Sequence, residues 1–88
     1  MFPQEIDGAK VLFYTDKTDF GIVADADGKE EKAISYLAIA QKKEDPAYYL
    51  MLCDADFALI TDHAFPAMEW CKTMAGIRYP DIVWHSVS

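Results

Sequence analysis

The fold is decided by Tyr48-Tyr-Leu-Met-Leu-Cys-Asp-Ala-Asp-Phe-Ala-Leu-Ile-Thr-Asp-His-Ala-Phe-Pro-Ala-Met-Glu-Trp70. Two runs in it, Tyr48 to Cys53 and Phe57 to Thr61, are apolar and rich in strand-forming residues, and short Asp side chains separate them. That pattern is typical of a β-hairpin. Because the runs are apolar on both faces, we expect the hairpin in the middle of a sheet.

A helix is predicted directly after this hairpin, from about residue 65 to residue 76. Pro66 suits the first helical turn, where its missing N–H costs nothing. Gly76 is expected to end the helix in the left-handed conformation. Four residues at helical spacing are expected to face the core: Ala67, Trp70, Cys71 and Met74.

Three further strands are predicted outside this stretch. Residues 10–15 and 20–24 are rich in β-branched and aromatic residues, and residues 82–87 form a similar closing run. The second strand is expected to end in a turn from Asp25 to Gly28, where Gly can adopt a positive φ. Residues 1–8 are expected to be a loose lead-in.

The segment from residue 30 to residue 41 fits two interpretations. Its apolar residues have helical spacing, with acids before them and lysines after them. The same segment contains Ile34-Ser-Tyr-Leu-Ala-Ile39, which would serve as a buried strand, and periodicity does not separate the two. We favour a strand from about Ile34 to Gln41, because residues 42–47 then form a hairpin loop of ordinary length.

Together these elements predict an α+β fold: a mostly antiparallel meander sheet with one helix packed on one face. Eighty-eight residues suit a single domain spanning residues 1–88. The hydrophobic fraction of 52% supplies a core without metal or disulfide staples. The two cysteines, Cys53 and Cys71, are expected to be buried and reduced, although a bridge between them stays open.

Location and partners are constrained by apolar runs and by charge. No run approaches the roughly 18–20 apolar residues that span a bilayer, and the N-terminus lacks signal-peptide features, so we expect a cytoplasmic protein. The formal net charge is −7, with the excess acids in the turns of the first two thirds. Such a surface repels nucleic acid and anionic membranes and speeds encounter with basic partners. Solubility alone would also account for these acids.

A resemblance to a protein family follows from the central motifs. Tyr36-Leu-Ala-Ile-Ala-Gln41, Tyr48-Tyr-Leu-Met-Leu-Cys-Asp54, Phe57-Ala-Leu-Ile-Thr-Asp62 and the late Trp84 resemble small acidic bacterial proteins of uncharacterised function. The resemblance covers about residues 34–84, and its motifs are structural ones of low specificity. It implies a strand, a hairpin and a helix before a C-terminal tryptophan, and it transfers no catalytic residue. The family's helix usually begins at a Ser or Asp cap, from which Phe65-Pro-Ala-Met-Glu-Trp70 departs.

Neither a metal site nor a cofactor is expected. In a twelve-residue calcium loop beginning at Asp25, Gly should stand sixth and Glu twelfth, but these positions hold Glu30 and Tyr36. The soft metal-ligand types lack the short paired spacings of zinc sites; they are Cys53, His63, Cys71 and His85.

A catalytic set is likewise not predicted. A nucleophilic thiol needs a histidine beside it that is oriented by an acid. Asp62 and His63 are expected at the hairpin-to-helix junction, whereas Cys71 is expected on the core side of the helix. Glycine-rich phosphate loops and basic–aromatic stretches for nucleic acid are missing from the sequence. We expect a non-enzymatic protein, and a small enzyme using Asp62 or His63 remains the minor alternative.

An interface is the best site hypothesis. One helix covers only one face of a sheet, so the other face is expected to expose several aromatic residues beside an acidic turn. The expected interface residues are Tyr14, Tyr36, Tyr49, Phe57, Asp54 and Asp56. Aromatic anchors ringed by acids are typical of protein-binding surfaces. Alternatively, the first hairpin or the tails cover these aromatics.

These features favour a protein-binding module for a partner with a basic surface, for example an immunity or inhibitor protein against a basic toxin or nuclease. The alternative is a structural homodimer that associates through the same sheet face. Nucleic acid and membrane are not expected as partners.

Overall fold

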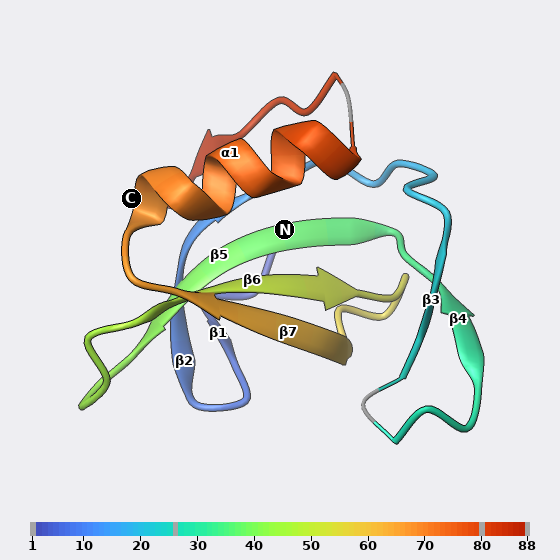
Figure 1. Ribbon diagram of the computed structural model, residues 1–88, viewed down its shortest axis with the longest axis horizontal. Coiled ribbons are helices and arrows are strands. Elements are labelled where there is room, and N and C mark those ends of the chain that lie inside the picture. Colours follow the sequence, from blue (N-terminus) through green and yellow to red (C-terminus); the bar gives the residue numbers. More distant parts are fainter. Residues whose placement is uncertain (1, 26, 80, 88) are drawn as a thin grey trace.

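The computed structural model describes residues 2–25, 27–79 and 81–87 and has the predicted α+β architecture (Figure 1). An antiparallel, curled sheet carries a single helix on one face. The elements in chain order are β1 (Glu5–Ile6), β2 (Ala9–Tyr14), β3 (Ile22–Ala24), β4 (Glu31–Ala33), β5 (Tyr36–Lys42), β6 (Tyr48–Cys53), β7 (Leu59–Phe65), α1 (Met68–Arg78) and β8 (His85–Ser86).

The main sheet has the strand order β1-β2-β5-β6-β7, and β8 pairs with the far end of β2. Every strand pairing among the described residues is antiparallel, and short connections join β1 to β2, β5 to β6 and β6 to β7. β3 and β4 form a separate two-stranded arm beside the sheet (Figure 1). The predicted central position of the hairpin is confirmed for β6, whereas β7 lies at the edge.

Strict alternation along β5 and β6 divides the core into two layers. Because successive side chains point to opposite faces, one layer faces α1 and the other faces away from it. The helix-side layer consists of Ile34, Leu37, Ile39, Leu50, Leu52, Ile60, Cys71 and Ala75. The opposite layer consists of Phe2, Ile6, Ala9, Val11, Ala38, Ala40, Met51 and Cys53.

A bulge in β2 lets one strand serve both layers. Val11 lies opposite Ala40 and Phe13 lies opposite Ile39, so Leu12 is the extra residue. In a regular strand Val11 and Phe13 would share a face. Here Val11 belongs to the layer away from the helix, whereas Phe13 packs against the helix-side layer.

The choice of a strand within residues 30–41 is correct. β5 begins at Tyr36, while Glu31–Ala33 form β4 of the arm. The predicted turn after β3 closes between Asp25 and Gly28, whose φ is +69°; Ala26 lies outside the described residues. The run after β6 forms a longer strand than predicted, because pairing with β6 continues through His63 to Phe65.

The helix differs from its prediction at both ends and on its faces. It runs from Met68 to Arg78, so Pro66 precedes it and Gly76 lies inside it. Cys71 is buried, as expected, but Trp70 is 59% exposed. The physical reason is size: Cys71 and Ala75 are small, so the helix can approach the sheet closely through them. α1 has eleven residues and is too short to cross a membrane.

Residues 2–8 are an ordered part of the fold instead of a loose lead-in. Glu5–Ile6 pair with the start of β2, and the backbone N–H of Val11 donates to the carbonyl of Gln4 at 2.9 Å. Phe2 is 7% exposed because its ring finds apolar partners on the sheet. At the other end, the closing strand is shorter than predicted and covers only His85–Ser86.

Candidate protein-interaction site

Three of the four predicted interface aromatics meet at one place on the sheet face away from α1. Tyr14 comes from the end of β2, Tyr36 from the start of β5, and Phe57 from the turn between β6 and β7. The ring of Phe2 lies among them, stacked on Tyr14 with centroids 4.9 Å apart. It meets Tyr36 and Phe57 edge-on at 5.5 and 5.3 Å. Such offset and edge-to-face contacts are the preferred aromatic geometries.

The N-terminal segment therefore covers part of the face that was expected to be open. Phe2 and Ile6 pack on it, and the aromatic residues around them are half-buried. This matches the alternative in which a tail covers the aromatics. Tyr14, Tyr36 and Phe57 remain partly accessible to solvent.

A shallow hollow of about 270 Å³ opens at this cluster. Its lining combines aromatic rings with one acidic and one basic side chain, namely Phe2, Tyr14, Thr15, Asp16, Lys17, Tyr36 and Phe57. Asp16 Oδ2 lies 3.0 Å from His85 Nε2, within hydrogen-bonding distance. The His85 ring lies 5.5 Å from that of Tyr14. The C-terminal strand thereby fixes the acidic side of the hollow.

The two acids of the predicted turn, Asp54 and Asp56, have different roles: Asp54 stabilises the turn, and Asp56 is exposed at the surface. Asp54 Oδ1 accepts hydrogen bonds from the backbone N–H groups of Asp56, at 2.9 Å, and Ala58, at 3.0 Å. These bonds hold the turn in which Phe57 adopts a φ of +64°. Residues other than glycine rarely adopt this left-handed backbone conformation. Asp54 thus presents Phe57 to the cluster, whereas the exposed Asp56 leaves its charge to solvent.

Tyr49 is not part of this cluster. It lies opposite Ala40, whereas Tyr36 lies opposite Cys53 at the other end of β6. Its hydroxyl donates to Asp45 Oδ2, and Lys42 Nζ lies 4.5 Å from its ring centroid. The hydrogen bond raises the pKa of Tyr49 and lowers the pKa of Asp45, which also accepts from the N–H of Ala47. These contacts among Lys42, Asp45 and Tyr49 stabilise the loop between β5 and β6.

The cysteines are free thiols buried in different layers, Cys53 away from the helix and Cys71 beneath it. Burial raises the pKa of Cys53 to about 12 and that of Cys71 to about 11. Both shifts oppose the thiolate form that a nucleophile or metal ligand needs. Asp62 and His63 lie within β7, so they are not at a helix entrance. Among the described residues, no cluster of three His, Cys, Asp or Glu side chains forms a metal site.

Sequence reasoning missed two sets of residues, one buried and one exposed. Phe2 was assigned to the lead-in, although large apolar side chains such as Phe are often buried. The second set is an outward row on α1, formed by Trp70, Met74 and Ile77. The i, i+4, i+7 spacing of this row was visible, but Trp70 and Met74 were assigned to the core.

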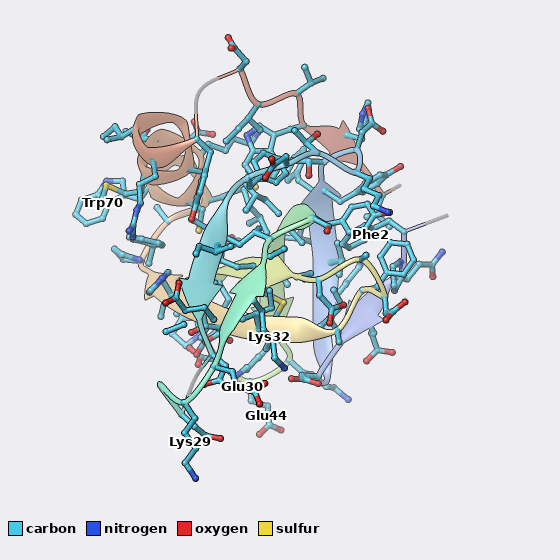
Figure 2. The ribbon with its side chains drawn as sticks, turned by 90° about the vertical axis from the view of Figure 1, so that its right-hand side faces the viewer. Phe2, Lys29, Glu30, Lys32, Glu44 and Trp70 are labelled. Atoms are coloured by element: carbon cyan, nitrogen blue, oxygen red, sulfur yellow. The ribbon has the colours of Figure 1, made fainter. Side chains whose placement is uncertain are left out.

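The two sets lie on opposite sides of the molecule, as Phe2 and Trp70 in Figure 2 make clear.

Comparison of the chain with protein-family models, with curated proteins and with solved structures finds no match.

Proposed function

We propose that this chain is a non-enzymatic protein-binding module that docks a partner with a basic surface at the aromatic hollow. The supporting observation is the hollow itself, which the rings of Phe2, Tyr14, Tyr36 and Phe57 line and which Asp16 and Lys17 border. A lysine or arginine side chain placed there would meet the faces or edges of aromatic rings and a carboxylate together. Cation–π and charge-assisted contacts favour such a residue over an acidic one.

The charge of the whole chain supports the same class of partner. A net charge of −7 attracts a basic protein over distances of about one Debye length and raises its association rate. An immunity or inhibitor protein against a basic toxin or nuclease is the concrete form of this proposal. Phe2 belongs to the floor of the docking site, since it supports the rings that the partner would touch.

Titration with an arginine-rich peptide, followed by backbone amide NMR, tests the proposal. Chemical-shift changes are expected at the hollow, around Tyr36 and Phe57, and not at Trp70 on the opposite side. Affinity should fall as salt increases, because exposed charges are screened.

Matched charge variants separate the hollow from the general acidity of the chain. Asp16→Asn is expected to weaken peptide binding about five- to ten-fold, which corresponds to roughly 1–1.4 kcal/mol. Glu44→Gln removes one charge elsewhere on the surface and should change binding less than about two-fold. If both variants lost the same amount of peptide affinity, the binding would depend on net charge alone and not on the hollow. Binding that is indifferent to salt would contradict the electrostatic part.

A further inference from the structure

In the described part of the chain, the edge of the main sheet at β7 has no strand paired to its outer side, although β3 of the arm contacts β7. β7 is the last strand in the order, and its outer edge pairs with no strand among residues 2–25, 27–79 and 81–87. An unpaired edge presents a row of N–H and C=O groups to any other strand. Proteins commonly protect such edges with proline, lysine or bulges. β7 has a bulge at Ile60, and Pro66 follows its end, but the run Thr61–Phe65 between them contains neither proline nor lysine.

An exposed apolar row lies beside this edge. Trp70, Met74 and Ile77 are 59%, 39% and 71% exposed, and they follow one another along the same side of α1. Met74 lines a hollow of about 510 Å³ together with His63 and Phe65 of β7 and other residues. The row and the open edge are therefore parts of one surface, which we call the β7/α1 surface.

This surface is electrically balanced in a strongly acidic protein. β7 and α1 together carry two acids, Asp62 and Glu69, and two bases, Lys72 and Arg78. The whole net charge of −7 therefore resides outside them. A basic partner gains little from such a surface, whereas an equally acidic second copy meets no local excess of like charge there.

We propose that the β7/α1 surface joins two copies of this chain. A two-fold axis perpendicular to the sheet would pair β7 with β7 of the second copy and extend the sheet through both subunits. The same axis places the two helices on one face, where their apolar rows cover each other and the hollows beneath them.

The register of this pairing follows from charge and face. Residues directly opposite each other in an antiparallel pair point to the same face, so a symmetric pair is centred on one residue meeting itself. Centring on Asp62 would bring two carboxylates together. Centring on His63 places Asp62 opposite Ala64 of the second copy, and Thr61 opposite Phe65. His63 is also the middle residue of Thr61–Phe65, so only centring there pairs the whole run with itself, and the geometry therefore points to His63 as the centre.

Analytical ultracentrifugation of the full chain tests this inference. The wild type is expected to sediment at twice the mass of one chain at about 100 µM. Trp70→Ser and Ile77→Ser should each raise the dissociation constant about ten-fold or more, because exposed aromatic and aliphatic anchors dominate such interfaces. Ile22→Ser removes an equally exposed residue, 65% accessible on the arm, and should leave the mass unchanged.

A charge exchange at His63 tests the register independently of the helix. His63→Lys and His63→Asp each place like charges opposite one another and are expected to sediment as monomers. An equimolar mixture of the two should restore a dimer, because opposite charges then meet. Circular dichroism confirms that each variant stays folded.

A monomeric wild type at that concentration would overturn the inference. So would a dimer that Ile22→Ser disrupts, or one that neither the helix variants nor the charge exchange affects. The proposed docking of a basic partner lies on the opposite side of the molecule, so either proposal can fail without the other.

Discussion

At the residue scale, buried polar groups in this fold are satisfied by specific partners. Thr15 is 3% exposed, and its Oγ1 accepts the N–H of Leu37 at 3.1 Å. Its own N–H donates to the carbonyl of Leu37 at 3.0 Å. A threonine at the end of β2 thereby prolongs pairing with β5 just where the chain turns away toward the arm. An unsatisfied N–H at this buried position would cost about 1–3 kcal/mol.

The buried thiols predict a loss of stability at alkaline pH. Burial raises the pKa of Cys53 to about 12, above the ordinary value of 9.0 that the unfolded chain should show. Between these values the unfolded thiol loses its proton and the native one keeps it. Unfolding then releases protons, so the free energy of unfolding falls as pH rises, by at most about 1.4 kcal/mol per pH unit for this thiol.

Chemical denaturation under reducing conditions, at several pH values from about 7 to 10.5, measures this slope. Cys53→Ala is the control: it should lower stability at every pH, because it leaves a small cavity, but its decline above pH 9.0 should be shallower than that of the wild type. Parallel declines in the two proteins would show that other groups cause the loss.

At the element scale, α1 illustrates what spacing does and does not determine. Apolar residues at helical intervals predicted a helix here, and the helix exists. Around the helix axis, Trp70 and Met74 lie to one side of Cys71, and Ala75 lies to its other side. The structure buries Cys71 together with Ala75 and leaves the two larger residues outward. From hydrophobicity alone, Trp70 was predicted to be in the core. The helix instead packs closely on the sheet, which favours the small side chains of Cys71 and Ala75 at the contact.

The position of Gly76 yields a prediction for the helix. It lies in the interior of α1, and a Cβ added there would meet nothing within 4 Å. Gly76→Ala should therefore raise the free energy of unfolding by about 0.5–1 kcal/mol, because alanine loses less backbone entropy in a helix. The control is Gly28→Ala, at a φ of +69°, which should destabilise the protein through backbone strain. Thermal and urea denaturation compare the two; a destabilised Gly76→Ala would mean that the helix ends there.

Much of the sheet could be predicted because its strands carry their own signals. β5 and β6 are apolar, bounded by turn residues, and joined by connections of ordinary length. Contacts between residues that are far apart in the sequence are harder to predict from it. Nothing local to Phe2 indicates that it will meet Tyr36, and nothing in Leu12 indicates a bulge that turns its neighbours to opposite faces. For the same reason, the candidate site was predicted in three of its four aromatics but not in the residue that joins them.

At the scale of the whole molecule, two coverings of different kind protect the two faces of the sheet. α1 covers one face through Cys71 and Ala75. The opposite layer is built mostly from small side chains of β2 and β5, such as Ala9, Ala38 and Ala40, and the N-terminal segment closes it. The N-terminal segment therefore forms the covering layer on this face, because α1 is the only helix among the described residues.

The N-terminal covering should contribute strongly to stability. Phe2→Ala removes a ring that is 7% exposed and touches Tyr14, Tyr36 and Phe57, so it should lower the free energy of unfolding by about 3 kcal/mol. Ile22→Ala, at a site 65% exposed, should change it by less than about 0.5 kcal/mol. Urea denaturation measures both, and binding of a hydrophobic dye to Phe2→Ala should increase as the sheet face opens. If Phe2→Ala were as stable as Ile22→Ala, the N-terminal segment would rest on the face without closing it, and the aromatic hollow would extend beneath Phe2.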